Sequence, residues 1–317
     1  MTARVRTIDC EYTDRPGIAA AYLIRDGDQA AFIETSTSLA VPRLMDALAD
    51  EGLSPDQVRW IIITHVHLDH AGGAGQLMKR CPFATLLAHP KAAVHAIDPT
   101  RIIAGAREVY GDAFDELYGE ILPIPEARVR VLEDGESVEL GERTLTVHYT
   151  RGHANHHFVV HDPGADAVFT GDAFGLVYPA LQRYRLCAFP STTPTDFDPA
   201  AAHEAVDLIA GLGAGRVFPT HFGEVTDVAG VAAQLHPLLD AHAAIVDDAD
   251  AADVSDEALD AYCLDRLSKV FERILVEAGL ADDAQARDMV KFDWQLNAQG
   301  LAFAVRKRRY KRKKGLA

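Results

Sequence analysis

The segment Thr64–His70 constrains this chain more than any other stretch. Within six residues it contains four side chains that can bind a metal ion: His65, His67, Asp69 and His70. The apolar run Trp60–Ile63 precedes it directly and is typical of a buried strand. His65 and His67 alternate by two and can point into one cavity, while Asp69 and His70 can reach a second centre. Imidazole and carboxylate ligands suit zinc, iron or manganese better than calcium, so the segment predicts a metal site.

Three more apolar runs each end in a residue of ligand type. They lead to Gly152-His153, Gly171-Asp172 and Thr220-His221. Catalytic groups often lie on loops that a rigid scaffold positions, as the loops at one edge of a sheet are. A glycine before His153 and before Asp172 fits the tight turn that a strand exit needs. We therefore expect these residues to join the Thr64–His70 segment in one site.

Together these motifs resemble the metallo-β-lactamase-fold hydrolase superfamily. The resemblance rests on His65-x-His67-x-Asp69-His70, Gly152-His153, Gly171-Asp172 and Thr220-His221. It implies an α/β fold, a four-layer αβ/βα sandwich with two sheets face to face and helices outside. It also implies one metal ion held by His65, His67 and His153, and a second held by Asp69, His70 and His221. Asp172 would bridge the two ions, and His157 matches a family position that often supports the site without binding metal.

The chemistry that the resemblance implies is hydrolysis of a small-molecule substrate. Two divalent ions, zinc or else iron or manganese, would provide a metal-bound hydroxide that cleaves an ester, lactone, thioester or phosphodiester. Asp69 and Asp172 would be catalytic as well as metal-binding, since Asp69 could orient the nucleophile. Tyr178 could donate a hydrogen bond to an oxyanion, with ordinary packing as its alternative role.

The branch within the superfamily stays open between glyoxalase II-like and lactonase-like enzymes. The Gly-Cys-Gly-Arg-like element of glyoxalase II is missing, because Asp172 is followed by Ala173-Phe174-Gly175. A lactonase could use Tyr178. The alternative class is a redox or oxygen-handling protein with one or two iron ions, since histidine and carboxylate also bind iron. The di-iron branch, however, has glutamate where this chain has His67.

Composition shifts after His221, and this predicts a helical C-terminal part. We expect a metal-binding domain over residues 1–250 and a helical extension with a basic tail over residues 251–317. The extension could dock on the domain or on a partner subunit, so a homo-oligomer is one expectation. Near the first motif, the glycines of the Gly72–Gly75 stretch predict a close approach of the backbone to the metal site.

The charge of the chain is unevenly distributed. Of its 31 basic residues, eight lie in the run 306–314, which leaves 23 basic against 47 acidic residues in residues 1–305, a net charge of −24. An acidic body repels polyanions and argues against nucleic acid as a partner of the main domain. The basic tail could bind RNA, an anionic membrane or the protein's own acidic surface, but a solvated, partly disordered tail is the favoured interpretation. Deleting residues 306–317 is then expected to leave hydrolysis of small esters nearly unchanged.

The remaining signals favour a cytoplasmic protein. The first residues lack the apolar stretch and cleavage site of a secretory signal, and no apolar run is long enough to span a bilayer. The cysteines at positions 10, 81, 187 and 263 are scattered without a CxxC pair, which is typical of free thiols in a reducing compartment. Cys187 is expected to act as a small apolar residue.

Overall fold

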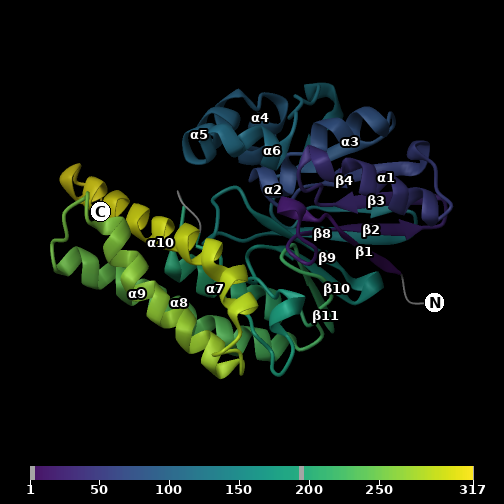
Figure 1. The fold of residues 1–317 in the computed structure, drawn as a ribbon. Helices are drawn as coiled ribbons and strands as arrows, with labels where there is room; N and C mark the ends of the chain where they lie inside the picture. Colours follow the sequence, from purple (N-terminus) through teal and green to yellow (C-terminus); the bar gives the residue numbers. More distant parts are fainter. Residues whose placement is uncertain (1–3, 193–195, 317) are drawn as a thin grey trace. The chain divides into compact units, whose positions relative to one another are not determined.

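The protein is described by a computed structural model that covers residues 4–192 and 196–316 (Figure 1). Its contacts divide the chain into two compact units, each assembled from separate stretches of sequence. Unit 1 comprises Met1–Tyr149, His156–Gly171 and Leu212–Thr226, and unit 2 comprises Thr150–Asn155, Asp172–Gly211 and Asp227–Ala317. The predicted domain boundary at residue 250 falls near the end of a long helix, and the division at that point stays a prediction.

Both sheets belong to unit 1. The first sheet has six strands in sequence order: β1 (Val5–Asp9), β2 (Ala20–Asp26), β3 (Gln29–Ile33), β4 (Val58–Ile62), β5 (Thr85–Ala88) and β6 (Val129–Val131). Strands β1 to β3 are antiparallel, and β3 to β6 are parallel to one another. Strands β2 and β3 form an antiparallel hairpin, with Asp26 opposite Gln29 at its turn.

The second sheet has five strands, in the order β11-β10-β9-β8-β7. Their bounds are β7 (Ser137–Leu140), β8 (Arg143–Tyr149), β9 (Phe158–Asp162), β10 (Ala167–Gly171) and β11 (Arg216–Pro219). All neighbours are antiparallel except the parallel pair β10 and β11. Each of the apolar runs that precede a candidate ligand is therefore a strand, as the sequence predicts.

Alternating side chains of the central strands build two cores. In β2, Tyr22 and Ile24 point into a core shared with the second sheet, where Phe158, Phe169 and Phe218 also lie. Ala21 and Leu23, which alternate with them, belong to a core on the other face of the first sheet. A strand that is buried on both faces reads as a continuous apolar run, which explains the sequence of β2 and β4. The two sheets thus pack face to face.

The helices of unit 1 are short. Their bounds are α1 (Val41–Asp50), α2 (Leu68–Ala71), α3 (Ala74–Arg80), α4 (Pro90–Ile97), α5 (Thr100–Tyr110) and α6 (Phe114–Tyr118). Leu44 and Leu48 of α1 are fully buried in the helix-side core of the first sheet. Leu68 of α2 packs in a separate cluster with Phe114 and Tyr118 of α6.

The glycines near α2 do allow a close approach, but the approach is between backbone segments. A Cβ on Gly73 would lie 2.7 Å from the carbonyl oxygens of Thr35 and Thr37. A Cβ on Gly75 would lie 2.1 Å from the carbonyl oxygen of Leu122. These glycines therefore let the segment that carries the ligands pack tightly against neighbouring loops.

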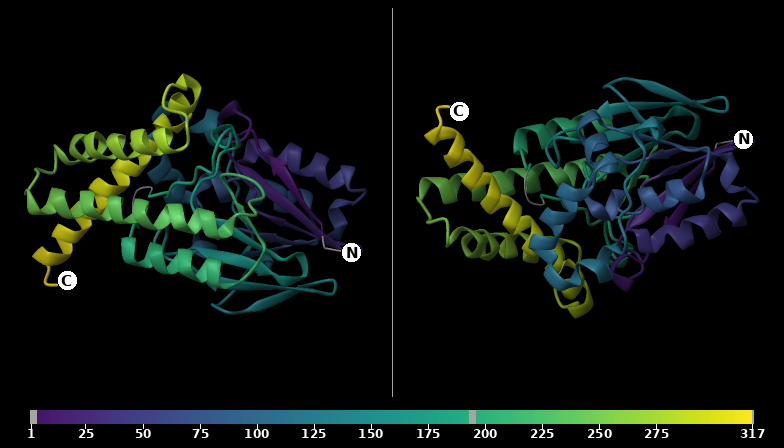
Figure 2. Two further views of the ribbon diagram at one scale, coloured as in Figure 1. Left: turned by 90° about the horizontal axis from the view of Figure 1, so that it is seen from below. Right: turned by 90° about the horizontal axis from the view of Figure 1, so that it is seen from above.

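Unit 2 is helical in its regular structure. Its helices are α7 (Pro199–Gly211), α8 (Val228–Ala251), α9 (Leu259–Glu277) and α10 (Ala284–Lys313). Helices α8, α9 and α10 pack on one another, and Figure 2 shows α10 in yellow crossing the green pair. The apolar face of helix α9 includes Cys263, Leu267 and Phe271, which are buried.

The interpretation of residues 306–314 as a partly disordered tail is wrong for the residues described, whereas residues 310–314 are exposed to solvent, as that interpretation expects. Residues 306–313 form the last turns of α10, and their guanidinium groups pair with acidic residues of unit 2. Arg306 pairs with Asp260, Arg308 with Asp247, and both Arg309 and Arg312 with Asp250. The arginines of the run therefore bind the protein's own acidic surface, because their charges lie opposite those of α8 and α9.

The two sheets and the helical C-terminal part confirm the expected α/β fold class. No helix in the described part of the chain is long and apolar enough to cross a membrane. The cysteines at positions 10, 81, 187 and 263 are free and buried. Burial raises the pKa of the Cys187 thiol to about 12, which fits its expected role as a small apolar residue. Cellular location and oligomeric state stay predictions.

Candidate metal centre

The Thr64–His70 segment begins where β4 ends. Residues 63–67 form a loop, and His67 precedes α2 as its N-cap residue with an extended backbone. Asp69 and His70 then lie in the single turn of α2. The strand end and the short helix together place the imidazoles of His65 and His67 edge to face, with ring centroids 4.4 Å apart.

Asp69, His70 and His221 form one group of ligand atoms, all within 4.8 Å of one another. Nε2 of His221 lies 3.4 Å from Oδ2 of Asp69, and Nε2 of His70 lies 3.7 Å from the same oxygen. Two ligands that are each about 2.0–2.2 Å from a shared zinc ion are separated by about this distance. The three side chains, two of them buried, therefore fit a single metal ion.

His221 is held by the segment between β1 and β2. Its Nδ1 lies 2.7 Å from the carbonyl oxygen of Ile18. A carbonyl can only accept, so Nδ1 carries the proton and Nε2 is the nitrogen that faces Asp69. Such a contact fixes both the tautomer and the direction of a metal-binding imidazole.

His65 and His157 are brought together by a glycine. Their ring centroids are 4.9 Å apart, and both side chains are buried. A Cβ on Gly171, which has a φ of +50°, would lie 2.5 Å from Nε2 of His157 and from Oγ1 of Thr64. Thr64 Oγ1 is in turn 3.0 Å from Nδ1 of His65. The glycine before Asp172 thus makes space for the side chains that support His65, in addition to allowing the turn.

His153 and Asp172 are the two candidate ligands of unit 2. His153 follows β8 by four residues, and Asp172 comes directly after β10. Their Nε2 and Oδ2 atoms are 3.6 Å apart. Nδ1 of His153 lies 3.2 Å from the carbonyl oxygen of Ser191, so it is the donor, and Nε2 is directed at Asp172.

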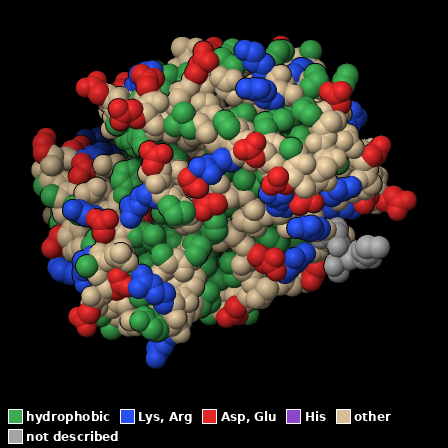
Figure 3. Space-filling model, turned by 45° about the vertical axis from the view of Figure 1, so that its right-hand side comes forward, with side chains coloured by type: hydrophobic (Ala, Val, Ile, Leu, Met, Phe, Trp, Pro, Cys, Tyr) green, Lys and Arg blue, Asp and Glu red, His purple; other side chains and the backbone are tan. Residues whose placement is uncertain are grey.

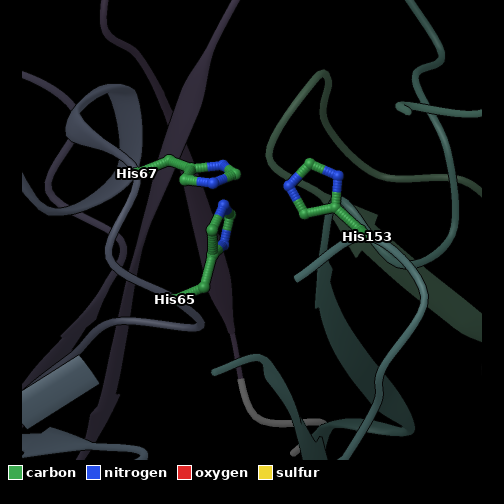
Figure 4. A group of neighbouring side chains, drawn as sticks. All are labelled: His65, His67 and His153. Carbon is green, nitrogen blue, oxygen red and sulfur yellow. The ribbon is translucent and has the colours of Figure 1, made fainter. Parts of the chain in front are cut away.

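Two further groups meet the same distance criterion of 4.8 Å. One consists of His65, His67 and His153, and Figure 4 shows their three imidazoles pointing toward a common space. The other consists of His65, His70 and Asp172. Every ligand that the sequence motifs predict belongs to at least one of the three groups. These groups could hold metal ions, and their imidazole and carboxylate donors suit a transition metal.

Glu34 is a member of this region that the motifs do not reveal. It is buried at the end of β3, where its Oε1 accepts the backbone N–H of Thr64 and its Oε2 lies 3.4 Å from Nδ1 of His70. A buried carboxylate beside His70 makes that imidazole a stronger ligand. The sequence signal was only a single acidic residue ending an apolar strand. His156, which lies 5.7 Å from the His67 ring centroid, was also not anticipated.

Tyr178 is buried, and its hydroxyl donates to Oδ1 of Asp293 on α10 over 3.2 Å. Its ring packs against Phe189 with a centroid distance of 5.8 Å. Both contacts favour the packing role that was the alternative for this residue.

Comparison with known proteins agrees with the geometry. The family model of the metallo-beta-lactamase superfamily matches residues 14–221. ST1585 of Sulfurisphaera tokodaii, a metallo-beta-lactamase fold-containing protein, is 25% identical over 181 residues, which cover 56% of this chain and 63% of that protein. The human acyl-coenzyme A thioesterase MBLAC2 is 27% identical over 178 residues, covering 49% of this chain and 57% of the thioesterase. The chain thus spans less than two thirds of the length of these relatives.

Solved structures share the fold. The metallo-beta-lactamase family protein TTHA1429 from Thermus thermophilus has a TM-score of 0.60 and 20% identity, covering 99% of this chain and 94% of its own. The structure of ST1585 has a TM-score of 0.60 and 23% identity over 73% of this chain and 85% of its own. The match to the family model includes every motif up to His221. This chain therefore belongs to the metallo-beta-lactamase superfamily.

Proposed function

We propose that the chain is a metal-dependent hydrolase of small molecules that carry an ester, lactone, thioester or phosphodiester bond. The observation that carries this proposal is the set of three overlapping His/Asp groups, each with ligand atoms within 4.8 Å. The donor set has no serine or cysteine nucleophile, so the attacking group is water. An intact set of ligands in a family of hydrolases argues for chemistry rather than for binding alone.

The proposed ligand assignment follows the three groups. His65, His67 and His153 would hold one ion, while Asp69, His70 and His221 would hold the other. Asp172 would contact both, since its group shares His65 with the first set and His70 with the second. When bound, two divalent ions lower the pKa of a shared water toward neutrality and polarise the substrate oxygen.

The protein's own side chains have defined tasks in this scheme. Asp69 would accept a proton or hydrogen bond from the attacking water, because its carboxylate is the more exposed of the two acidic candidate ligands, 24% against 5% for Asp172. Glu34 keeps His70 oriented through Nδ1. Burial raises the pKa of Tyr118, and the nearby charges of Tyr12 and Asp69 add to that rise, so its hydroxyl stays protonated. Tyr12 and Tyr118, whose hydroxyl oxygens are 3.2 Å apart, are therefore hydrogen-bonding groups near Asp69.

Among the possible substrates, a thioester has the support of a relative, since MBLAC2 is named as an acyl-coenzyme A thioesterase. Lactone hydrolysis would need an oxyanion donor, and Tyr178 is the proposed candidate for that role. Its hydroxyl would then have to exchange Asp293 for the substrate. Replacing Tyr178 with phenylalanine distinguishes the two roles: a packing residue leaves kcat nearly unchanged, whereas an oxyanion donor lowers it by about 100-fold.

The deciding experiment combines metal analysis with a substrate panel. We expect two equivalents of zinc per chain and turnover of at least one acyl-coenzyme A thioester, aryl ester, lactone or phosphodiester. The Asp172→Ala and His67→Ala variants should fold normally, lose one or more equivalents of metal and lose most activity. Wild-type turnover by a folded Asp172→Ala protein would rule out the bridging role. Iron with a visible absorption band and no turnover of the panel would favour the redox alternative instead.

A further inference from the structure

Helix α10 is tied by a buried asparagine to the Pro190–Thr192 loop, which contacts the candidate ligand His153. Asn297 is only 2% exposed and lies more than a hundred residues from this loop in the sequence. Its Oδ1 accepts the N–H of Thr192 over 2.8 Å, and its Nδ2 donates to the carbonyl oxygen of Pro190 over 2.9 Å. The Thr192 amide can only donate and the Pro190 carbonyl can only accept, so one orientation of the Asn297 amide satisfies both.

The residue between these two anchors is Ser191, whose carbonyl oxygen accepts from Nδ1 of His153. Asn297 therefore holds the backbone on both sides of the carbonyl group that orients His153. Ser191 and Thr192 are buried as well, so water does not readily replace the two hydrogen bonds of the Asn297 amide. A shift of the Ser191 carbonyl would turn the His153 imidazole and move its Nε2.

A second tie links α10, through Asp196, to the Gly152–Asn155 segment that carries His153. Nζ of Lys307 lies 3.1 Å from Oδ1 of Asp196, and Oδ2 of Asp196 accepts the backbone N–H of Asn155 over 3.2 Å. Asn155 is two residues from His153. Burial opposes the charge of Asp196, but the Asn155 amide and the Lys307 ammonium outweigh it and lower the pKa of this carboxyl. It therefore remains an anion that can accept both contacts.

The Gly152–Asn155 segment itself has little freedom to adjust. A Cβ on Gly152 would lie 2.4 Å from the backbone nitrogen of Ala202 on α7, and the carbonyl oxygen of Gly152 accepts the N–H of Asp198. The Gly152–Asn155 segment is thus pressed against α7 and linked to α10 through Asp196, while Asn297 of α10 holds the Pro190–Thr192 loop that orients His153. All of these residues belong to unit 2.

We propose that Asn297 is a positioning residue for the metal centre, and that Lys307 and Asp196 assist it. Asn297 fixes the Ser191 carbonyl, which holds the Nδ1 proton of His153 and directs Nε2 to the metal held with His65 and His67. Helix α10 is then part of the catalytic unit rather than an appendage. This inference rests on the proposed function, because it requires His153 to bind metal.

The test measures metal affinity and coordination in the full-length protein. Zinc affinity is determined for each equivalent by competition with a chelating dye, and the cobalt-substituted protein is compared by its absorption spectrum. Asn297→Ala should lower the affinity for one of the two zinc equivalents by about 10–100-fold and change the cobalt spectrum. This is the effect expected when the partner of a metal-binding histidine is no longer held in place. The second equivalent should be retained. Gln299→Ala, on the exposed side of the same helix, is the matched control and should behave as wild type.

A second pair of variants keeps the inference testable if Asn297→Ala fails to fold. Asp196→Asn and Lys307→Gln should each lower the affinity for the same zinc equivalent several-fold. The double variant should bind zinc no more weakly than either single variant, because both substitutions break the same ion pair. Arg308→Gln, which removes the pair with Asp247, is their control. Unchanged affinities and spectra in all folded variants of a protein that does bind zinc would overturn the inference alone. A wild-type protein that binds no metal would instead defeat the proposed function.

Discussion

At the scale of single residues, the metal centre depends on contacts made by atoms that do not bind metal. His221 is oriented by the Ile18 carbonyl and His153 by the Ser191 carbonyl. His65 is supported by Thr64, which itself needs the space left by Gly171. The ligand motifs are therefore necessary, but the direction of each imidazole comes from its neighbours.

Gly171 gives a direct test of this dependence. Gly171→Ala would place a Cβ 2.5 Å from both His157 and Thr64 and would hold alanine at a φ of +50°. We expect at least a 10-fold loss of zinc affinity together with a lower melting temperature. Gly27→Ala is the matched control, since Gly27 has a φ of +57° but nothing within 4 Å of the added Cβ. It should cost only the backbone strain of about 1 kcal/mol and leave zinc binding intact. Equal zinc affinities in the two variants would contradict the steric argument.

At the scale of elements, the sequence predicts the strands better than it predicts the contacts between distant segments. The runs before His65, His153, Asp172 and His221 are strands because apolar, β-branched stretches that end in polar turns have few alternatives. The assembly of the ligands could also be predicted, because the motifs match a family whose ligand order is known. Glu34 could not, since a single carboxylate after a strand carries no spacing signal. The hydrogen bonds of Asn297 join residues more than a hundred positions apart, and no local sequence pattern encodes them.

One element-scale prediction concerns strands β8 and β9. Arg143 and Asp162 form a buried ion pair across these strands, and Asp162 also accepts the N–H of Ala165 in the following turn. Asp162→Ala would leave the guanidinium buried without its carboxylate, so we expect the free energy of unfolding to fall by about 3–5 kcal/mol in urea denaturation. Replacing both residues with apolar ones of similar size should cost less than Asp162→Ala alone. A loss below about 1 kcal/mol for Asp162→Ala would show that the pair is already hydrated.

At the scale of the whole molecule, the strongly negative charge is distributed so that it stabilises the C-terminal helix. The chain carries a net charge of −16, and on the face drawn in Figure 3 acidic and basic side chains are interspersed. Within unit 2, Asp250 accepts both Arg309 and Arg312. Burial disfavours its charge, but these two partners lower the pKa of Asp250 overall. The basic run therefore neutralises acidic residues of its own unit.

This arrangement changes the expected effect of deleting the tail. Deleting residues 306–317 removes Lys307 and Arg309, and we now expect a loss of about 1–3 kcal/mol in the free energy of unfolding and reduced hydrolysis. Deleting only residues 310–317 keeps Lys307 and Arg309. Of the two ion-pair partners of Asp250, this deletion removes only Arg312. That shorter deletion should behave nearly as wild type in urea denaturation and in small-ester turnover. Equal stability and turnover in the two deletions would restore the interpretation of the tail as an appendage.

The dependence of stability on pH follows from a histidine far from the metal ligands in the sequence. His242 is fully buried in α8, where its Nδ1–H donates to the Leu238 carbonyl. Burial lowers its pKa from 6.5 to about 4, although the contact with Leu238 opposes the shift. As the pH falls below about 6.5, the unfolded chain takes up a proton at this position and the folded chain does not.

The free energy of unfolding should therefore decrease between about pH 6.5 and pH 4, by up to about 3 kcal/mol from this group, and then level off. His242→Met fills the same apolar site without a titrating group and should remove that part of the decrease. Urea denaturation of both proteins at several pH values, with a chelator present, separates this effect from loss of metal. Because the metal ligands are treated identically in both proteins, only the difference between the two curves reports on His242. Parallel curves from about pH 7 to pH 4 would mean that the buried imidazole is already accessible to protons in the folded protein.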